Sequence, residues 1–387
     1  FGAMVKALFI NGGAIDGDKA LPAAPVAYLV ITNTTYAGNA DLADLQSVTA
    51  GGPITIAATN TNDIDAVTGS VATTISATSG SVAISAAVAA AVAENVVGTE
   101  VTAGIRNSDV STTVGGVNID ALSDTTVDAV TFAVSIGVSG SSSVAGSFSG
   151  AGARATNTIT GVTLATIDTG SDVDAPGSIT VDALDTSAIS SDVVSASVSV
   201  GASSSVALSF AISVTLAENT IGGATSALIA NSDADSSAGS VLVTATGLNT
   251  IDAVAVAASA SVAGSGSFAL SGAGAGARAS NSTTNQISAR ITNGDVDAPL
   301  GSVSVTASDT SGITADVTSA AASVAASGSA AVSVAIAVTL AENSIGGTTI
   351  ASIDPSTVDA GGTVTVSATA DNTIDALAAA IGVSVGG

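Results

Sequence analysis

Large and small side chains alternate along several uncharged stretches of the chain. From Val206 to Leu216, large apolar residues occupy the even positions, whereas Ser, Ala and Thr occupy the odd positions. The same alternation returns from Val332 to Leu340. A period of two places the two kinds of side chain on opposite faces of a β-strand, and the β-branched content disfavours a helix. The pattern therefore predicts long strands with one large-residue face and one small-residue face.

The small-residue face has a mechanical consequence. Ala, Ser and Gly allow a second sheet to approach closely and to pack densely, as dry interdigitated sheets do. We therefore expect a stiff, protease-resistant body.

Two residue types return along the chain at a nearly constant spacing. An asparagine recurs every 62 residues without a gap, at Asn33, Asn95, Asn157, Asn219, Asn281 and Asn343. A glycine recurs at steps of 61 to 64 residues, at Gly52, Gly116, Gly177, Gly239, Gly301 and Gly362. Each glycine is followed by a short alternating run, so the glycines are expected to mark turns. Units that repeat their turns at a fixed spacing stack on one another, which predicts a solenoid.

The units alternate between two kinds. A glutamate precedes every second asparagine of the series, at Glu94, Glu218 and Glu342, and Arg154 and Arg278 lie 124 residues apart. The full period is therefore 124 residues. Residues 1–20 fit the pattern worst and are expected to be a partial or irregular unit, followed by a continuous β-repeat array over residues 21–387.

The fold predicted from these repeats is all-β, a parallel β-solenoid of six 62-residue units. We expect about four strands in each unit, separated by turns at the repeated glycine, at the polar residues before an Ile-Asp pair, at a Gly/Ser cluster and at the repeated asparagine. One geometry makes each unit a single wide rung, and another makes it three coils of roughly 20 residues. Long alternating strands and a continuous asparagine ladder favour the wide rung, with stacked hairpins or a sandwich as further alternatives.

Composition excludes several other classes of protein. Hydrophobic residues make up 47% of the chain and the mean hydropathy is +0.62, which is too apolar for a disordered low-complexity tract. Residues 193–217 and 317–341 are uncharged and long enough to cross a bilayer. They are diluted with Ser, Gly and Thr and alternate by two, so we expect no membrane span. The start at Phe1 shows no signal-peptide pattern, and we expect the chain to be a fragment of a longer protein.

The net charge of -25 argues against nucleic acid and anionic membranes as partners and suits a solvated extracellular surface. Two arginines stand out against this background. Arg154 and Arg278 occupy positions that hold Leu216 and Leu340 in the other kind of unit. In stacked wide rungs they would lie diagonal to Glu94, Glu218 and Glu342. They could form a binding site for an acidic group, but a ladder of ion pairs between rungs is the favoured interpretation.

Acidic residues gather in short segments before the repeated glycines. Calcium would suit such carboxylates, and the candidate ligands are Asp172, Asp174, Asp295 and Asp297. The segments match neither the EF-hand nor the glycine-rich calcium nonapeptide, so solvated turns are the favoured interpretation. No other cofactor is expected.

Nothing in the chain predicts an enzyme. Asp65, Asp128 and Asp252 could offer paired carboxylates, but a residue repeated in every unit is more often structural than catalytic. The chain has no His, no Cys and no phosphate-binding loop. The repeated asparagines are interpreted as turn stabilisers whose amides stack along the axis, and Asn33 and Asn281 also match the glycosylation acceptor pattern.

Residues 205–223 (SVALSFAISVTLAENTIGG) and 357–387 (TVDAGGTVTVSATADNTIDALAAAIGVSVGG) carry a family resemblance. They resemble the repeats of large bacterial filamentous adhesins, of the haemagglutinin and leukotoxin-type kind. The resemblance implies export to the cell surface, a β-solenoid shaft, and adhesion or filament formation.

The sequence therefore predicts the structural shaft of an extracellular fibre or cell-surface adhesin, without catalysis. We expect self-association into filaments or end-to-end stacking, because open solenoid ends expose unpaired strands. The alternative is a module that binds calcium or a repetitive surface such as polysaccharide or ice. A β-helical polysaccharide lyase or hydrolase would need a cluster of acidic and basic residues that is not repeated, and the sequence offers none.

Overall fold

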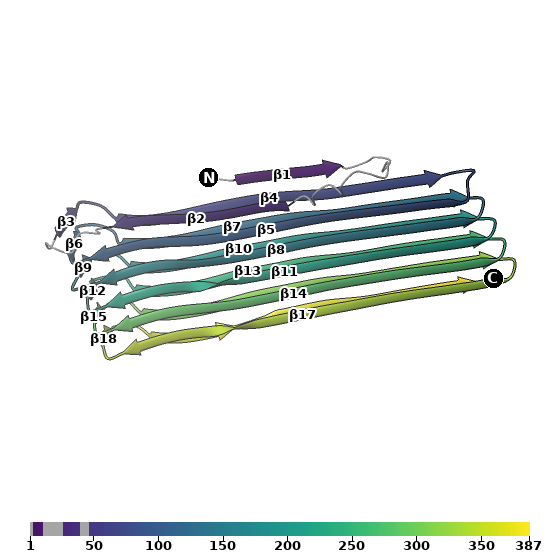
Figure 1. The fold of residues 1–387 in the computed structure, drawn as a ribbon. Coiled ribbons are helices and arrows are strands. Elements are labelled where there is room, and N and C mark those ends of the chain that lie inside the picture. The colour runs from purple at the N-terminus through teal and green to yellow at the C-terminus, as the bar shows by residue number, and fades with distance from the viewer. Residues whose placement is uncertain (1–2, 11–25, 39–45) are drawn as a thin grey trace.

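The protein is a parallel β-solenoid (Figure 1). The computed structural model describes residues 3–10, 26–38 and 46–387, and within them all regular secondary structure is β-strand. The strands form three parallel sheets, here called A, B and C. One pass of the chain through A, B and C makes a rung, and the rungs stack along the solenoid axis.

Sheets A and B contain the long strands. Sheet A holds β1 (Ala3–Ile10), β4 (Ile54–Ala77), β7 (Val117–Ser141), β10 (Ile179–Ser203), β13 (Val241–Ser265), β16 (Val303–Ser327), β19 (Val364–Ala370) and β20 (Thr373–Gly386). Sheet B holds β2 (Val26–Gly38), β5 (Val82–Arg106), β8 (Val144–Asp168), β11 (Val206–Ala230), β14 (Phe268–Thr292) and β17 (Ala330–Asp354). A strand of 25 residues spans about 80 Å.

Sheet C is short and lies at one end of the long strands (Figure 1). It holds β3 (Gln46–Ala50), β6 (Ser108–Thr112), β9 (Asp172–Ala175), β12 (Asp233–Ser236), β15 (Asp295–Ala298) and β18 (Thr357–Ala360). These segments were expected to be solvated turns, and that expectation is wrong for the residues just before the glycine. Their alternation of Asp with Val or Ala points one side chain in and the next out, as a strand requires.

The register confirms one wide rung per unit. Each residue of β10 pairs with the residue 62 positions later in β13, from Ile179↔Val241 to Ser203↔Ser265. The same offset joins β11 to β14 and β14 to β17. Three small coils per unit are therefore excluded.

Each full unit contains three strands, not the four that the sequence predicted. The predicted turns at the repeated glycine and at the Gly/Ser cluster are present. The turn predicted at the asparagine is wrong, because Asn219 lies in the middle of β11. The turn predicted before the Ile-Asp pair is likewise absent from β10 and β13, and appears as a break only between β19 and β20. A fully paired long strand satisfies every backbone group without a turn, so polar residues alone do not interrupt it.

The small-residue face of the long strands lies inside the molecule. In β11, Ala211, Ser213 and Ala217 are buried, whereas Ile212 and Val214 are exposed. Most of the interior between sheets A and B is therefore lined by Ala and Ser, together with a column of isoleucines that contains Ile189, Ile251 and Ile313. Near sheet C the core changes to Val and Ile, because three sheets enclose a wider space there than two closely packed sheets do.

The first unit departs from the strict period. Strand β2 pairs Leu29 with Asn95 and Asn33 with Thr99, so the placement of Asn33 in the asparagine ladder is wrong by four residues. An even shift keeps every residue on its face, which is why the strand pattern gave no warning of it. Of the irregular unit expected over residues 1–20, β1 is described and pairs with β4; residues 1–2 and 11–20 lie outside the described residues.

Candidate functional site: stacked ladders and an acidic row

Five asparagines form a continuous ladder inside sheet B. Each side-chain amide donates from Nδ2 to Oδ1 of the asparagine one rung further on, at 2.7 to 2.9 Å. The members are Asn95, Asn157, Asn219, Asn281 and Asn343. The ladder satisfies amides that are shielded from water, so it favours one register of stacking. Asn281 is buried within it, which leaves its amide inaccessible to glycosylation in the folded chain.

A second ladder crosses between the two long sheets. Serine hydroxyls alternate between sheets A and B and connect at 2.8 to 2.9 Å, in the order Ser199, Ser209, Ser261, Ser271, Ser323 and Ser333. Hydroxyl groups can donate and accept at once, so each serine joins two neighbours. The sequence analysis did not identify this ladder, although both serine series recur every 62 residues.

The repeated glycines lie in the bends between sheets C and A. A Cβ atom at Gly116, Gly239 or Gly301 would overlap backbone atoms of the neighbouring rung, and those at Gly177 and Gly362 would also be too close to their neighbours. At Gly52, in the first described bend, a Cβ would meet nothing within 4 Å. The glycines are therefore required mainly because the bends stack closely, and none of the six adopts a positive φ.

Among the described residues other than glycine, positive φ occurs at the corner between sheets B and C. Asn107, Asn231 and Asn293 adopt φ values of 46°, 50° and 51°, and Thr169 holds the same corner with φ of 62°. Asparagine tolerates the left-handed region better than other residues with a Cβ. This column was missed in the sequence, where its spacing of 62 or 124 residues is visible.

Arginine and glutamate form ion pairs between rungs on the outer face of sheet B. Arg154 Nη2 lies 2.5 Å from Glu218 Oε2, and Arg278 binds Glu342 through both Nε and Nη2. Arg278 also lies 4.0 Å from Glu218. Hydrogen bonding to Arg154 is the main reason why the pKa of Glu218 is lowered. Arg154 is in register with Leu216, so the contact to Glu218 is the expected diagonal one.

Glu94 differs from the other two glutamates. Within the part of the chain that the structure describes, no cation lies within 4.0 Å of it. A further pair that the sequence analysis missed joins Arg106 Nε to Asp168 Oδ2 at 3.1 Å. These residues are direct register partners in β5 and β8.

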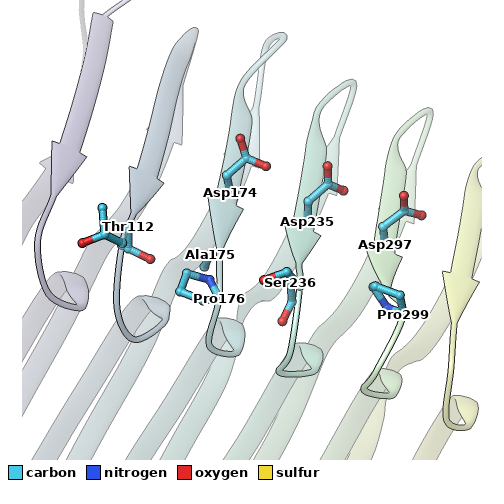
Figure 2. A pocket seen from close by; sticks show the side chains of 10 residues that line it. Thr112, Asp174, Ala175, Pro176, Asp235, Ser236, Asp297 and Pro299 are labelled. Atoms are coloured by element: carbon cyan, nitrogen blue, oxygen red, sulfur yellow. The ribbon is translucent and has the colours of Figure 1, made fainter.

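Sheet C carries a row of outward-facing aspartates (Figure 2). Asp174, Asp235 and Asp297 project in the same direction from three successive short strands. They line a shallow hollow together with Ser236, Pro176 and Pro299. Asp172, Asp233 and Asp295 form a parallel row two residues earlier.

One group of three carboxylates in this row is close enough to share a cation. Oxygen atoms of Asp172, Asp174 and Asp235 all lie within 4.8 Å of one another. Asp295 and Asp297, which the sequence analysis had combined with Asp172 and Asp174, lie two rungs away from them with β12 in between. The missing member, Asp235, keeps the same spacing in the sequence as its neighbours.

Burial and crowding raise pKa values in the acidic row. Burial, followed by repulsion from Asp297 and Asp174, raises the pKa of Asp235 to about 6. Burial and neighbouring aspartates also raise the pKa values of Asp172 and Asp297. Protons or a hard divalent cation would relieve this repulsion, and calcium accepts carboxylate oxygens readily.

A second acidic group lies on the outer face of sheet A. Asp63, Asp65 and Asp128 have carboxylate oxygens within 4.8 Å of one another. Burial and repulsion from Asp65 and Asp63 raise the pKa of Asp128. Asp65 and Asp128 are register partners in β4 and β7, whereas Asp252 pairs with Ser190 and Thr314. The repeated aspartates therefore do not form one continuous carboxylate column.

The interior also contains a polar belt, centred on Asp185. Burial raises the pKa of this aspartate to about 6, while a hydrogen bond from Ser187, 2.9 Å from Oδ1, acts in the opposite direction. Asp309, 124 residues later, accepts the equivalent bond from Ser311. The belt separates the Val/Ile core from the Ala/Ser core and was not predicted.

Comparisons with known proteins identify no relative. No protein-family model, curated protein or solved structure matches the chain. Among the described residues there is also no helix of the length and apolarity needed to cross a membrane.

Proposed function

We propose that this chain is a segment of the rigid shaft of an extracellular fibre or cell-surface adhesin, with a structural and not a catalytic role. The observation that carries the proposal is the unbroken register from β5 to β17, in which one 62-residue rung lies directly on the next. Such an array grows in one dimension by adding rungs, and each rung contacts only its neighbours.

The distribution of polar groups supports a structural role. The asparagine and serine ladders repeat from rung to rung, and they are used to hold rungs together. A catalytic site needs a unique constellation of groups, whereas these groups recur. The acidic surface and the resemblance of residues 205–223 and 357–387 to filamentous adhesin repeats favour an exported, solvated shaft that associates with other copies.

Electron microscopy tests the shaft proposal. Ten extra tandem copies of the 124-residue double unit should lengthen the particle by about 100 Å along the solenoid axis, at about 4.8 Å per rung. The width should stay constant. Particles that become round, or that widen instead of lengthening, would contradict the proposal.

Calcium binding is a second candidate function, supported by the three converging carboxylates of Asp172, Asp174 and Asp235. Calcium should raise the melting temperature of the wild-type chain, because an ion bound only by the folded state stabilises it. Asp235→Asn should remove most of that rise, whereas the same change at exposed Asp192 should not. A melting temperature that is identical in calcium and in excess chelator would exclude this function.

A further inference from the structure

The outer face of sheet B is apolar over much of its length, and its surface height varies from strand to strand because large side chains alternate with glycine. On β11, Ile212 is 58% exposed and pairs in register with Gly150 on one side and Gly274 on the other. At the positions in register with Ile212, β5 carries Val88 and β17 carries Ile336, and the strands β5, β11 and β17 are here called ridge strands. The strands β8 and β14 carry glycine at the positions in register with Ile212 and Val214 and are called trough strands; their outward glycines there are Gly150, Gly152, Gly274 and Gly276. Two residues earlier β14 also has glycine, Gly272, whereas β8 has Phe148, whose ring stacks on Phe210 of β11.

The troughs are open over part of their length. A Cβ atom at Gly152 or Gly276 would meet no atom within 4 Å. At Gly272 the ring of Phe210 leans into the trough instead. Ridges recur on every second strand, about 9.6 Å apart. A ridge of one molecule therefore has the spacing needed to lie in a trough of another.

Charge on the same face follows the same alternation. The trough strands carry Arg154 and Arg278, and the ridge strands carry Glu94, Glu218 and Glu342. A displacement by one strand therefore places arginine rows against glutamate rows. Glu94 has no cation within 4.0 Å in the described part of the chain, so it can accept a pair from outside.

We propose that this face binds the same face of a second copy, side by side. The two-fold axis runs parallel to the strands, between β8 and β11. Each ridge strand then lies over a trough strand, β11 of one copy over β8 of the other and β5 over β14. In this arrangement Arg278 of one copy reaches the strand that carries Glu94 of the other.

The area is sufficient for a specific dimer. Four strands of about 36 Å cover about 19 Å across the sheet, which is on the order of 700 Å² from each copy. A typical stable interface buries about 800 Å² per partner. Residues 82–93, 144–153, 206–217 and 268–277 contain no charged side chain, so pairing them desolvates no ion. This pairing does not depend on the shaft role.

Sedimentation equilibrium of the full chain tests the pairing. The wild type should be a dimer at about 100 µM, and Gly152→Val should raise the dissociation constant at least about tenfold by filling a trough. Valine suits an exposed strand better than glycine, so the melting temperature should hold or rise. Ile212→Lys should give the same loss from the ridge side, and Glu94→Gln should reduce the dependence of pairing on salt.

Val198→Lys is the matched control, because Val198 is exposed on the outer face of sheet A. It should leave the dimer unchanged. A wild-type chain that stays monomeric overturns the pairing. Adsorption of this face to a hydrophobic resin would not rescue it, because the face would then bind a partner other than a second copy. A dimer that survives both Gly152→Val and Ile212→Lys overturns it as well. Neither result affects the shaft proposal, which the electron microscopy tests independently.

Discussion

The contribution of a single residue to stability depends mainly on the residues stacked next to it in the neighbouring rungs, and Asp185 is an example. The register partners of Asp185 are Ser123 in one neighbouring strand and Gly247 in the other. Its carboxylate faces the interior, accepts a hydrogen bond from Ser187 and lies near the negative charge of Asp124. The column of register partners also contains Asn60, so an amide already fits this position in another rung.

Asp185→Asn should stabilise the folded chain at pH 8 and leave it nearly unchanged at pH 4.5. Burial raises the pKa of Asp185 from 3.8 to about 6, so the folded state binds this proton more tightly than the unfolded chain does. Its contribution to stability is present below pH 4 and is lost as pH rises through about 6. A shift of this size corresponds to at most about 3 kcal/mol.

Urea unfolding at the two pH values measures this effect. Asp192→Asn is the control, because Asp192 is exposed on the outer face of the same strand. If Asp185→Asn instead destabilises the chain at pH 8, the hydrogen bonds of the carboxylate contribute more to stability than the burial of its charge costs.

Elements are held by two different kinds of contact. Along the axis, strands are joined by backbone hydrogen bonds and by the asparagine ladder within sheet B. Between sheets, the small residues allow close approach, and the serine ladder crosses the gap. The bends between sheets C and A must stack as closely as the strands do, which is why they use glycine.

Gly301→Ala should therefore destabilise the solenoid by about 1–3 kcal/mol, the usual cost of overpacking. The added Cβ would overlap the carbonyl oxygen of Gly239 in the neighbouring rung. Gly264→Ala is the control, because a Cβ there meets no atom within 4 Å. Thermal unfolding of both variants measures the difference, and equal melting temperatures would show that the bends can move apart at no cost.

The whole molecule presents three chemically different surfaces. Sheet C carries stacked aspartates, and the outer face of sheet A carries Asp128, Asp192 and Asp252 among its apolar residues. The outer face of sheet B carries its arginine and glutamate rows and, near its end at sheet C, the pair of Arg106 and Asp168, and among the described residues its part beyond these rows, away from sheet C, is free of charge. Most of the negative charge is therefore on two sides, which leaves the third side able to approach another copy without strong repulsion.

Because each rung contacts mainly the next, the stability of the molecule is approximately a sum over rungs and their interfaces. A local change such as Gly301→Ala weakens one interface and not the entire stack. The repeated ladders thus give a long shaft uniform strength, which is the property that the proposed function needs.

The sequence by itself determined the period and the strands. Asparagines and glycines at steps near 62 residues fixed the rung length, and alternation of large and small residues fixed the β-strands, because both patterns are local or strictly repeated. It also placed Arg154 diagonal to Glu218, since register follows directly from the period.

Only the tertiary structure decided which face lies inside. Alternation separates large from small side chains but does not say which set is buried, and here the Ala/Ser face is buried because two flat sheets pack most closely through small residues. The serine ladder that begins with Ser199 and Ser209 could not be predicted either, because its members lie on two facing sheets whose contact the sequence does not specify. Asn219 could not be recognised as a mid-strand residue, because an amide that suits a turn in isolation becomes a ladder only when identical rungs stack on both sides.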